Sequence, residues 1–198
     1  MTIEKGAPWG SAGRVPVDAE VASSDHDLAA SSGVCVLTGG NLHTAIGSPA
    51  AKTPGSDCAL LPVDAIIVDI EAPDGTRRTV TAAADVIVGS WFGRHGFLLV
   101  TNTGHLGGLH LTPRSHPNDG RLDTLVMQPD MRWRERIVAR RRARTGTHVP
   151  HPKLATGHVR TLTVARRGRQ PLHIDGRNEG HWRSVTVTVS PDRWLVAV

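Results

Sequence analysis

The predicted fold depends most on the stretch His173-Ile174-Asp175-Gly176-Arg177-Asn178-Glu179-Gly180. Strand-like alternation of apolar and polar residues leads in over 161–165 and out over 184–189. An Asp-Gly pair between two such runs is a strong local signal for a reversing loop, so we expect Asp175 at the end of a strand, held on a rigid element. A second pair, Asp119-Gly120, precedes another apolar strand at 124–127.

Further strands are predicted upstream of both turns. Residues 63–70, 79–88 and 97–102 have strand-like apolar patterns, with an alanine-rich bend inside the second run and a hairpin turn at 72–76. We expect the nearby aromatic residues Trp91, Phe92 and Phe97 to pack in the core. Pro8-Trp9-Gly10 and Arg14-Val15-Pro16 read as irregular, and residues 23–30 suit a short helix capped by Ser24 or Asp25.

Composition restricts the class of protein. The chain has 198 residues, enough for one domain or for a domain with a small attachment. No apolar run reaches the roughly 18 residues that a membrane-spanning helix needs, and the first residues lack the order of a signal peptide. Two cysteines, Cys35 and Cys58, suit a reducing compartment. We therefore expect a cytoplasmic protein that can associate with the membrane surface.

The order of several short motifs resembles the diacylglycerol kinase catalytic family, which includes bacterial lipid kinases and sphingosine kinases. Val100-Thr101-Asn102, Gly107-Gly108 and residues 118–123 look like the middle of that family. Gly146-Thr147-His148, Ile174-Asp175-Gly176 and residues 191–196 follow in the same order. The resemblance covers roughly residues 60–198. No single motif is specific to the family, but the order of all these motifs along the chain is.

The resemblance implies a mainly β (α+β) fold. The family combines an α/β nucleotide-binding half with a β-sandwich of the NAD kinase type. Here we expect residues 1–58 to be a truncated remnant of the first half, a short α/β extension, and residues 59–198 to be the sandwich.

Gly39-Gly40-Asn41 lies between a short apolar run and a helix-like run, an arrangement that can place backbone N–H groups around a phosphate. Read from the residues alone, it is more often a simple strand-to-helix turn. The resemblance leaves two alignments open. Either Asn41-Leu42 and residues 46–49 are the end of a nucleotide-contacting motif, or Gly39-Gly40-Asn41 matches the family's Gly-Gly-Asp-Gly-Thr phosphate loop. Both alignments disfavour ATP binding, because only about 40 residues stand where the family has its nucleotide-binding sheet, and in the second alignment Asn41 also replaces the aspartate.

Asp119 and Asp123 flank the other Asp-Gly turn and offer oxygen ligands to a hard cation such as Mg²⁺, although an Asx-type turn with exposed carboxylates is the common alternative. The resemblance implies a structural Mg²⁺ held by Asp119 and by the main-chain carbonyls of His116 and Arg121. The spacing of the histidines, including His148 and His151, does not favour a zinc site.

Asp175 is, by resemblance, the general base that would activate a lipid hydroxyl. Active relatives carry a glutamate two residues later, where this chain has Arg177. A positive neighbour lowers the pKa of an aspartate and weakens it as a base.

Residues 131–144 contain seven arginines and one glutamate. A helix there would pair Trp133 with Ile137 on a packed face and leave a basic surface opposite. That surface is either simply solvated or attracted to anionic lipid headgroups. No base-reading motif accompanies it, so we do not expect a specific nucleic-acid partner.

Two functions follow. One is an ATP-dependent lipid kinase with reduced or lost activity, whose nucleotide site a homodimer mate or partner chain would complete. The other is a non-catalytic lipid- or partner-binding regulatory module derived from such a kinase.

Overall fold

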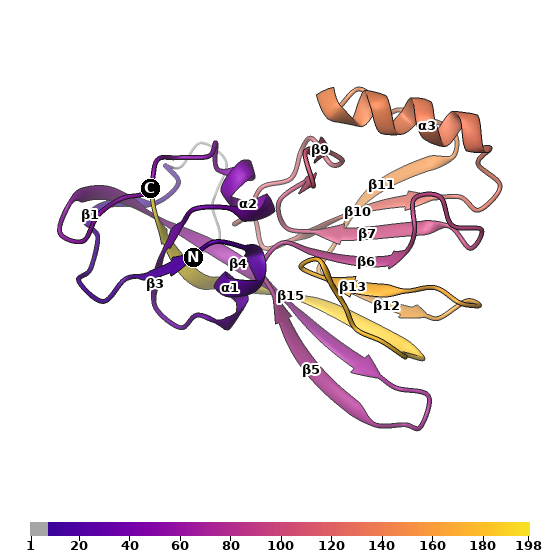
Figure 1. The fold of residues 1–198 in the computed structure, drawn as a ribbon, viewed down its shortest axis with the longest axis horizontal. Coiled ribbons are helices and arrows are strands. Elements are labelled where there is room, and N and C mark those ends of the chain that lie inside the picture. Colours follow the sequence, from indigo (N-terminus) through magenta and orange to yellow (C-terminus); the bar gives the residue numbers. More distant parts are fainter. Residues whose placement is uncertain (1–7) are drawn as a thin grey trace.

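The computed structural model describes residues 8–198, which form two packed β-sheets with helices at their margins (Figure 1). The first sheet has seven strands in the order β1-β4-β15-β3-β2, with β5 added beside β4 and β12 beside β15. The strands of this sheet are β1 (Ser11–Arg14), β2 (Glu20–Ala22), β3 (Val34–Leu37), β4 (Asp57–Glu71), β5 (Arg77–Ala82), β12 (Thr161–Ala165) and β15 (Ser184–Ala197).

The second sheet has the order β11-β10-β7-β6-β13-β14. Its strands are β6 (Asp85–Gly89), β7 (Phe97–Thr101), β10 (Leu122–Met127), β11 (Leu154–Val159), β13 (Leu172–Ile174) and β14 (Arg177–Asn178). A separate two-stranded ribbon of β8 (His105–Leu106) and β9 (Leu109–His110) lies in the loop after β7.

The core between the two sheets explains the mainly β, sandwich-type fold that the sequence predicts. Alternate residues of β4 and β15 point inward and meet alternate residues of β6, β7, β10 and β13. The central members are fully or almost fully buried: Ile66, Val68, Ile70, Val86, Val88, Val100, Leu122, Leu172, Ile174, Trp182, Val185 and Val187.

The strands β4 and β15 are long enough to serve both ends of the molecule (Figure 1). They pair antiparallel along most of their length, with an irregularity between Ser190 and Trp194. Beyond it, β15 pairs in parallel with β3, and β4 pairs with β1. Segments from residues 1–58 therefore extend the first sheet of the sandwich. The proposed division at residue 58 stays a prediction.

The N-terminal extension also contributes α1 (Asp25–Ala30) and α2 (Gly40–Ala45). Helix α1 is capped by the Ser24 side chain, as the sequence predicts. Strand β1 ends at Arg14, so the irregular stretch predicted at 14–16 begins one residue later, and β2 lies where the sequence predicts no strand. Both strands are short and mostly exposed, so their sequences lack the alternation of apolar and polar residues that predicts a strand. They are identified by their pairing with β4 and β3.

Helix α3 (Trp133–Arg142) continues into the short 3₁₀ turn η1 (Ala143–Thr145) and covers the outer face of the second sheet (Figure 1). Its packed side differs from the prediction. Trp133 is 65% exposed, whereas Arg136, Ala139 and Ala143 are buried. The Arg136 guanidinium enters because carbonyl oxygens of Met131, Trp91, Gly93 and Pro129 accept all its hydrogen bonds.

The predictions for the aromatic residues near 91–97 and for the strands around Asp175 are each confirmed only in part. Trp91 and Phe97 are buried and pack edge to face, but Phe92 is 47% exposed. The runs flanking the Asp175 stretch do pair, as β12 with β15. Asp175 itself caps a smaller hairpin of β13 and β14, which belongs to the other sheet.

Candidate functional site: two aspartate-glycine turns

Asp175 follows β13 directly and adopts a left-handed backbone conformation with φ of 44°. Its carboxylate accepts three backbone hydrogen bonds: Oδ2 from Ala83 N at 2.8 Å, and Oδ1 from Ala84 N and Asp85 N at 3.0 Å each. Its own N–H donates to the Asp85 carbonyl oxygen at 3.0 Å. The side chain therefore closes the bend between β5 and β6, where the chain crosses from one sheet to the other and leaves amides without strand partners.

The Gly39-Gly40-Asn41 turn begins α2 and lies against a second aspartate, Asp25. The amides of Asn41 and Leu42 donate to the Asp25 carboxylate at 2.6 and 2.9 Å. Gly40 has φ of 99°, and a Cβ atom there would come within 2.6 Å of Asp25 Oδ1. At Gly39 an added Cβ would collide with the Ser23 carbonyl oxygen. Both glycines are thus required by the close approach of the segment 23–25.

Asn41 connects this turn to Asp175 through Asp85. Its Nδ2 donates to Asp85 Oδ2 at 2.8 Å, while its Oδ1 accepts from Gly107 N at 3.0 Å. Since the Asp85 amide donates to Asp175, the structure brings the predicted phosphate turn and the predicted base together. The link between them is Asp85, which the sequence analysis did not single out.

Three carboxyl groups converge at this junction: Asp25 and Asp85 are buried and Asp175 is half-buried. Burial raises the pKa of Asp85 to about 7, the Asp175 charge adds to that rise, and the Asn41 hydrogen bond opposes it. Burial likewise raises the pKa of Asp25 and of Asp175, in spite of the amides that donate to each. This direction corrects the expectation that Arg177 lowers the pKa of Asp175. Among the described residues, Asp85 Oδ1 has no hydrogen-bond partner. An aspartate inside the otherwise apolar run 82–88 was the available signal.

The turn at Asp119 is built differently. Asp64, fully buried in β4, accepts hydrogen bonds from Asn118 Nδ2 at 3.0 Å, Gly120 N at 2.8 Å and Asp192 N at 3.0 Å. The Asp119 carboxylate only accepts from Arg121 N, two residues on, at 3.0 Å. The neighbouring aspartate in β4, not the aspartate of the turn, therefore fixes this loop.

Asn102 connects the two turns. It is fully buried, and its amide donates to the Ala84 carbonyl oxygen in the bend that Asp175 closes. Its Nδ2 donates to the carbonyl oxygens of Asp64 at 2.7 Å and Pro117 at 3.3 Å. The motif Val100-Thr101-Asn102 therefore ties the β5–β6 bend to the Asp119 loop.

The donor set for the predicted Mg²⁺ is sparse. Asp119 is the single carboxylate of that set, and one of its oxygens is engaged with Arg121 N. The adjacent carboxylates are committed elsewhere, Asp64 to the loop and Asp123 to His158 Nδ1 at 2.7 Å. Within residues 8–198, no group of three or more His, Cys, Asp or Glu side chains is arranged to hold a metal. The Mg²⁺ site formed by Asp119 and the main-chain carbonyls of His116 and Arg121 stays a prediction.

A polar row crosses the second sheet between these features. The register pairs Asp85 with Thr101, Thr101 with Asp123, and Asp123 with His158. Directly opposed residues in antiparallel strands share a face. This row therefore lies on the α3 side of the sheet, next to the apolar residues Leu99 and Leu125. The sequence offers no signal for it, because it depends on the pairing of four strands.

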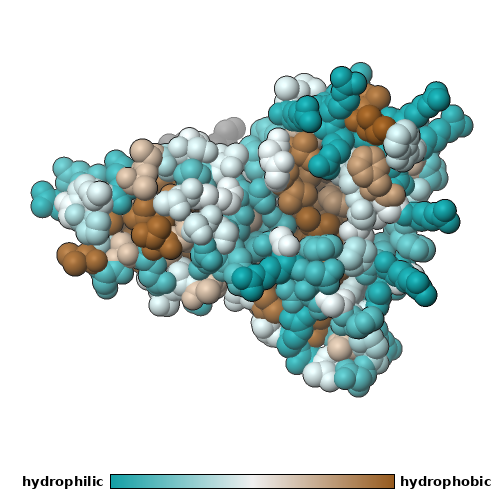
Figure 2. Space-filling model, viewed as in Figure 1, coloured by the Kyte–Doolittle hydropathy of each residue, from teal (hydrophilic) through white to brown (hydrophobic). Residues whose placement is uncertain are grey.

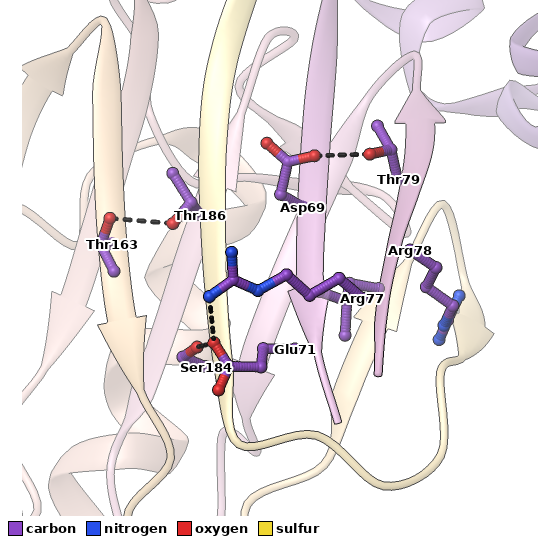
Figure 3. Close-up of a pocket in the computed structure, with 9 residues that line it drawn as sticks. Asp69, Glu71, Arg77, Arg78, Thr79, Thr163, Ser184 and Thr186 are labelled. Carbon is purple, nitrogen blue, oxygen red and sulfur yellow. Dashed lines mark hydrogen bonds and ion pairs between the residues drawn. The ribbon is translucent and has the colours of Figure 1, made fainter. Parts of the chain in front are cut away.

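A hollow with a volume of about 620 Å³ lies on the outer face of the first sheet (Figure 3). Its polar groups pair with one another: Thr79 with Asp69, Thr163 with Thr186, and both Arg77 and Ser184 with Glu71. None of the site residues predicted from the sequence lines it. We regard it as a ladder of cross-strand pairs on a solvent-facing sheet.

Comparisons with known proteins place this arrangement in a family. A candidate diacylglycerol kinase from Bacillus anthracis str. Sterne has a similar structure, with a TM-score of 0.50, 10% identity, and coverage of 82% of this chain and 69% of that one. A diacylglycerol kinase structure from the same strain gives a TM-score of 0.48 with 10% identity, covering 82% of this chain and 66% of that one. At this identity, the likeness shows the fold alone.

No curated protein matched the chain in the sequence comparison. The structure contains no helix of the length and apolarity needed to span a bilayer within the described residues. The family model of the YegS C-terminal NAD kinase beta sandwich-like domain matches residues 74–198, more than half of the chain and both aspartate-glycine turns. The chain therefore belongs to the YegS C-terminal, NAD kinase-like β-sandwich family.

Proposed function

We propose that this chain is a non-catalytic, lipid kinase-like module, which binds its ligand or partner without transferring phosphate. One observation carries the proposal. The two sets of groups that phosphoryl transfer would need, the Asp175 carboxylate and the Asn41 and Leu42 amides that follow Gly39-Gly40, are already bonded inside the fold. The chemistry would require both to face a substrate.

The first support concerns the base. A general base must reach the proton that it removes with an available lone pair. Both oxygens of Asp175 accept backbone amides, and those amides would lose their partners if the carboxylate turned toward a substrate. Each buried amide left without a partner costs about 1–3 kcal/mol. Asp175 is therefore better suited to hold the bend than to accept a proton.

The second support concerns the nucleotide. A phosphate loop works because its free amides face the anion. Here Asp25 occupies the position in front of Asn41 N and Leu42 N, and an incoming phosphate would also meet the Asp25 charge. A partner chain or second copy could complete a nucleotide site only by displacing Asp25. Neither Mg²⁺ nor ATP is part of the proposed function.

The test is nucleotide binding followed by transfer. Thermal unfolding is measured with and without millimolar Mg²⁺-ATP, and labelled phosphate transfer is measured to diacylglycerol in mixed micelles. We expect no thermal shift and no product. A ligand at about 100 times its Kd would raise the melting temperature by about 5–10 °C in a chain of this size. A shift of that size, or transfer that is lost in Asp175→Asn, would overturn the proposal and restore the kinase hypothesis.

A further inference from the structure

Helix α3 presents an unusual combination of side chains to solvent. The exposed arginines on and beside it are Arg132, Arg134, Arg140, Arg141, Arg142 and Arg144. Between them, Trp133 is 65% exposed and Val138 is 48% exposed. The helix lies at the margin of the molecule, and this margin shows hydrophobic residues among hydrophilic ones (Figures 1 and 2). A merely solvated helix has no need of exposed tryptophan and valine.

The helix is held rigidly from its other side. Arg136 donates four hydrogen bonds to carbonyl oxygens beneath the helix, and Trp91 Nε1 donates to the Arg136 carbonyl oxygen at 3.0 Å. Glu135 Oε2 accepts from Arg132 N at 2.7 Å at the helix start. The outward face is thus a fixed surface.

Charge on that face is unbalanced. None of its six arginines forms an ion pair with an acidic side chain of the described residues, while the nearby acids Asp130 and Glu135 pair with Lys153. Helical periodicity places Arg134, Val138 and Arg141 on the line opposite the buried Ala139 and Ala143. Cationic and apolar groups therefore share one exposed face.

A hollow adjoins this face. It has a volume of about 260 Å³ and lies between α3 and the following loop, and its lining residues are Arg134, Glu135, Val138, Ala139 and Arg142 of the helix and His148 and His151 of the loop. The carboxylate among them, Glu135, pairs with Lys153 at 3.9 Å. Arg134 and Arg142 lie at the two ends of this hollow with Val138 between them. Their guanidinium groups can bind phosphate, and Val138 provides an apolar surface beside them. Such a hollow suits a headgroup at a lipid-water boundary.

We propose that the outward face of α3 docks on an anionic lipid membrane, with its arginines on headgroup phosphates and Trp133 and Val138 in the interfacial layer. Basic residues near an anionic surface each strengthen binding by about five-fold, and tryptophan prefers the interface. Binding of single-stranded nucleic acid would instead use several stacking aromatics, and on α3 the exposed aromatic is Trp133 alone. This inference rests on the proposed function, because it identifies an anionic membrane as the binding partner of the non-catalytic module.

Vesicle binding tests the inference without nucleotide, so its failure is distinct from a failure of the non-catalytic function. The chain is sedimented with vesicles of phosphatidylcholine alone or containing a fraction of phosphatidylglycerol. We expect binding only to the second kind, weakening as salt rises. The triple variant Arg134→Glu/Arg141→Glu/Arg142→Glu should lose at least about ten-fold in partitioning. The control Arg77→Glu/Arg160→Glu/Arg193→Glu carries the same charge change on other exposed residues and should retain binding.

Trp133 supplies a second readout. Trp91, Trp182 and Trp194 are buried and Trp9 is half-buried, so Trp133 is the tryptophan that a membrane would desolvate. Anionic vesicles should shift the emission to shorter wavelength, and Trp133→Phe should abolish the shift while circular dichroism stays unchanged. The inference is overturned by absent binding to anionic vesicles, by equal losses in both triple variants, or by tighter retention on duplex DNA at the same salt.

Discussion

The two aspartate-glycine turns have the same local sequence signal but opposite internal designs. At Asp175 the aspartate of the turn is the anchor, with three backbone amides donating to its carboxylate. At Asp119 the turn is anchored from outside, because Asp64 in β4 accepts from the loop and Asp119 accepts only from Arg121 N. The difference teaches that the Asp-Gly pair predicts a reversal, while long-range contacts decide whether its carboxylate is free.

Asp64→Ala should produce the largest loss. It removes the acceptor for Asn118 Nδ2, Gly120 N and Asp192 N at a fully buried position. We expect the free energy of unfolding to fall by about 4 kcal/mol, measured by urea denaturation. A loss below about 1 kcal/mol would mean that Asp64 does not anchor the Asp119 loop.

Asp175→Ala should follow, with a loss of about 3 kcal/mol, since it leaves the Ala83, Ala84 and Asp85 amides without an acceptor. Hydrogen exchange should show lost protection at those three amides first. Were the variant as stable as the parent, with protection intact, Asp175 would be free for chemistry and the comparison would fail.

The junction around Asp175 should also make stability depend on pH. Burial raises the pKa of Asp85 to about 7 in the folded chain, from 3.8 when unfolded. The folded state thus retains a proton that the unfolded state releases, so stability is fully present below the unfolded pKa and is lost as pH rises through the folded one. We expect a fall of about 2 kcal/mol from about pH 5 to pH 7. Asp85→Asn should flatten that slope, and an unchanged slope would place the titration elsewhere.

Asp119→Ala should have the smallest effect, about 0.5–1 kcal/mol, because it removes one hydrogen bond to Arg121 N in a half-buried turn. Asp119→Asn, which keeps an acceptor oxygen, is the matched control and should be almost neutral. A loss for Asp119→Ala as large as that of Asp175→Ala would show that both turns anchor themselves alike. Addition of Mg²⁺ that stabilises the parent but not Asp119→Ala would instead support the predicted metal site.

Local signals explain the part of the fold that the sequence predicts. The strands near 63–70 and 97–102, the Ser24 cap and the strand-to-helix turn at Gly39-Gly40 all depend on neighbouring residues, and each is found. The run 79–88, predicted as one bent strand, is divided between β5 of the first sheet and β6 of the second. Asp25 and Asp85 were missed because their partners lie 16 to 44 residues away. The packed face of α3 was predicted wrongly at Trp133, because carbonyl groups from two other segments, 91–93 and 129–131, select Arg136 for burial.

The central claim is that internal bonds occupy the groups a phosphoryl-transfer site would need. A crystal structure of the chain grown with Mg²⁺ and a non-hydrolysable ATP analogue tests it most directly. The account predicts unchanged contacts of Asp25 with Asn41 and Leu42 and of Asp175 with the 83–85 bend, with no nucleotide density at Gly39-Gly40. Density for the analogue at that turn, with Asp25 displaced from it, would contradict the account.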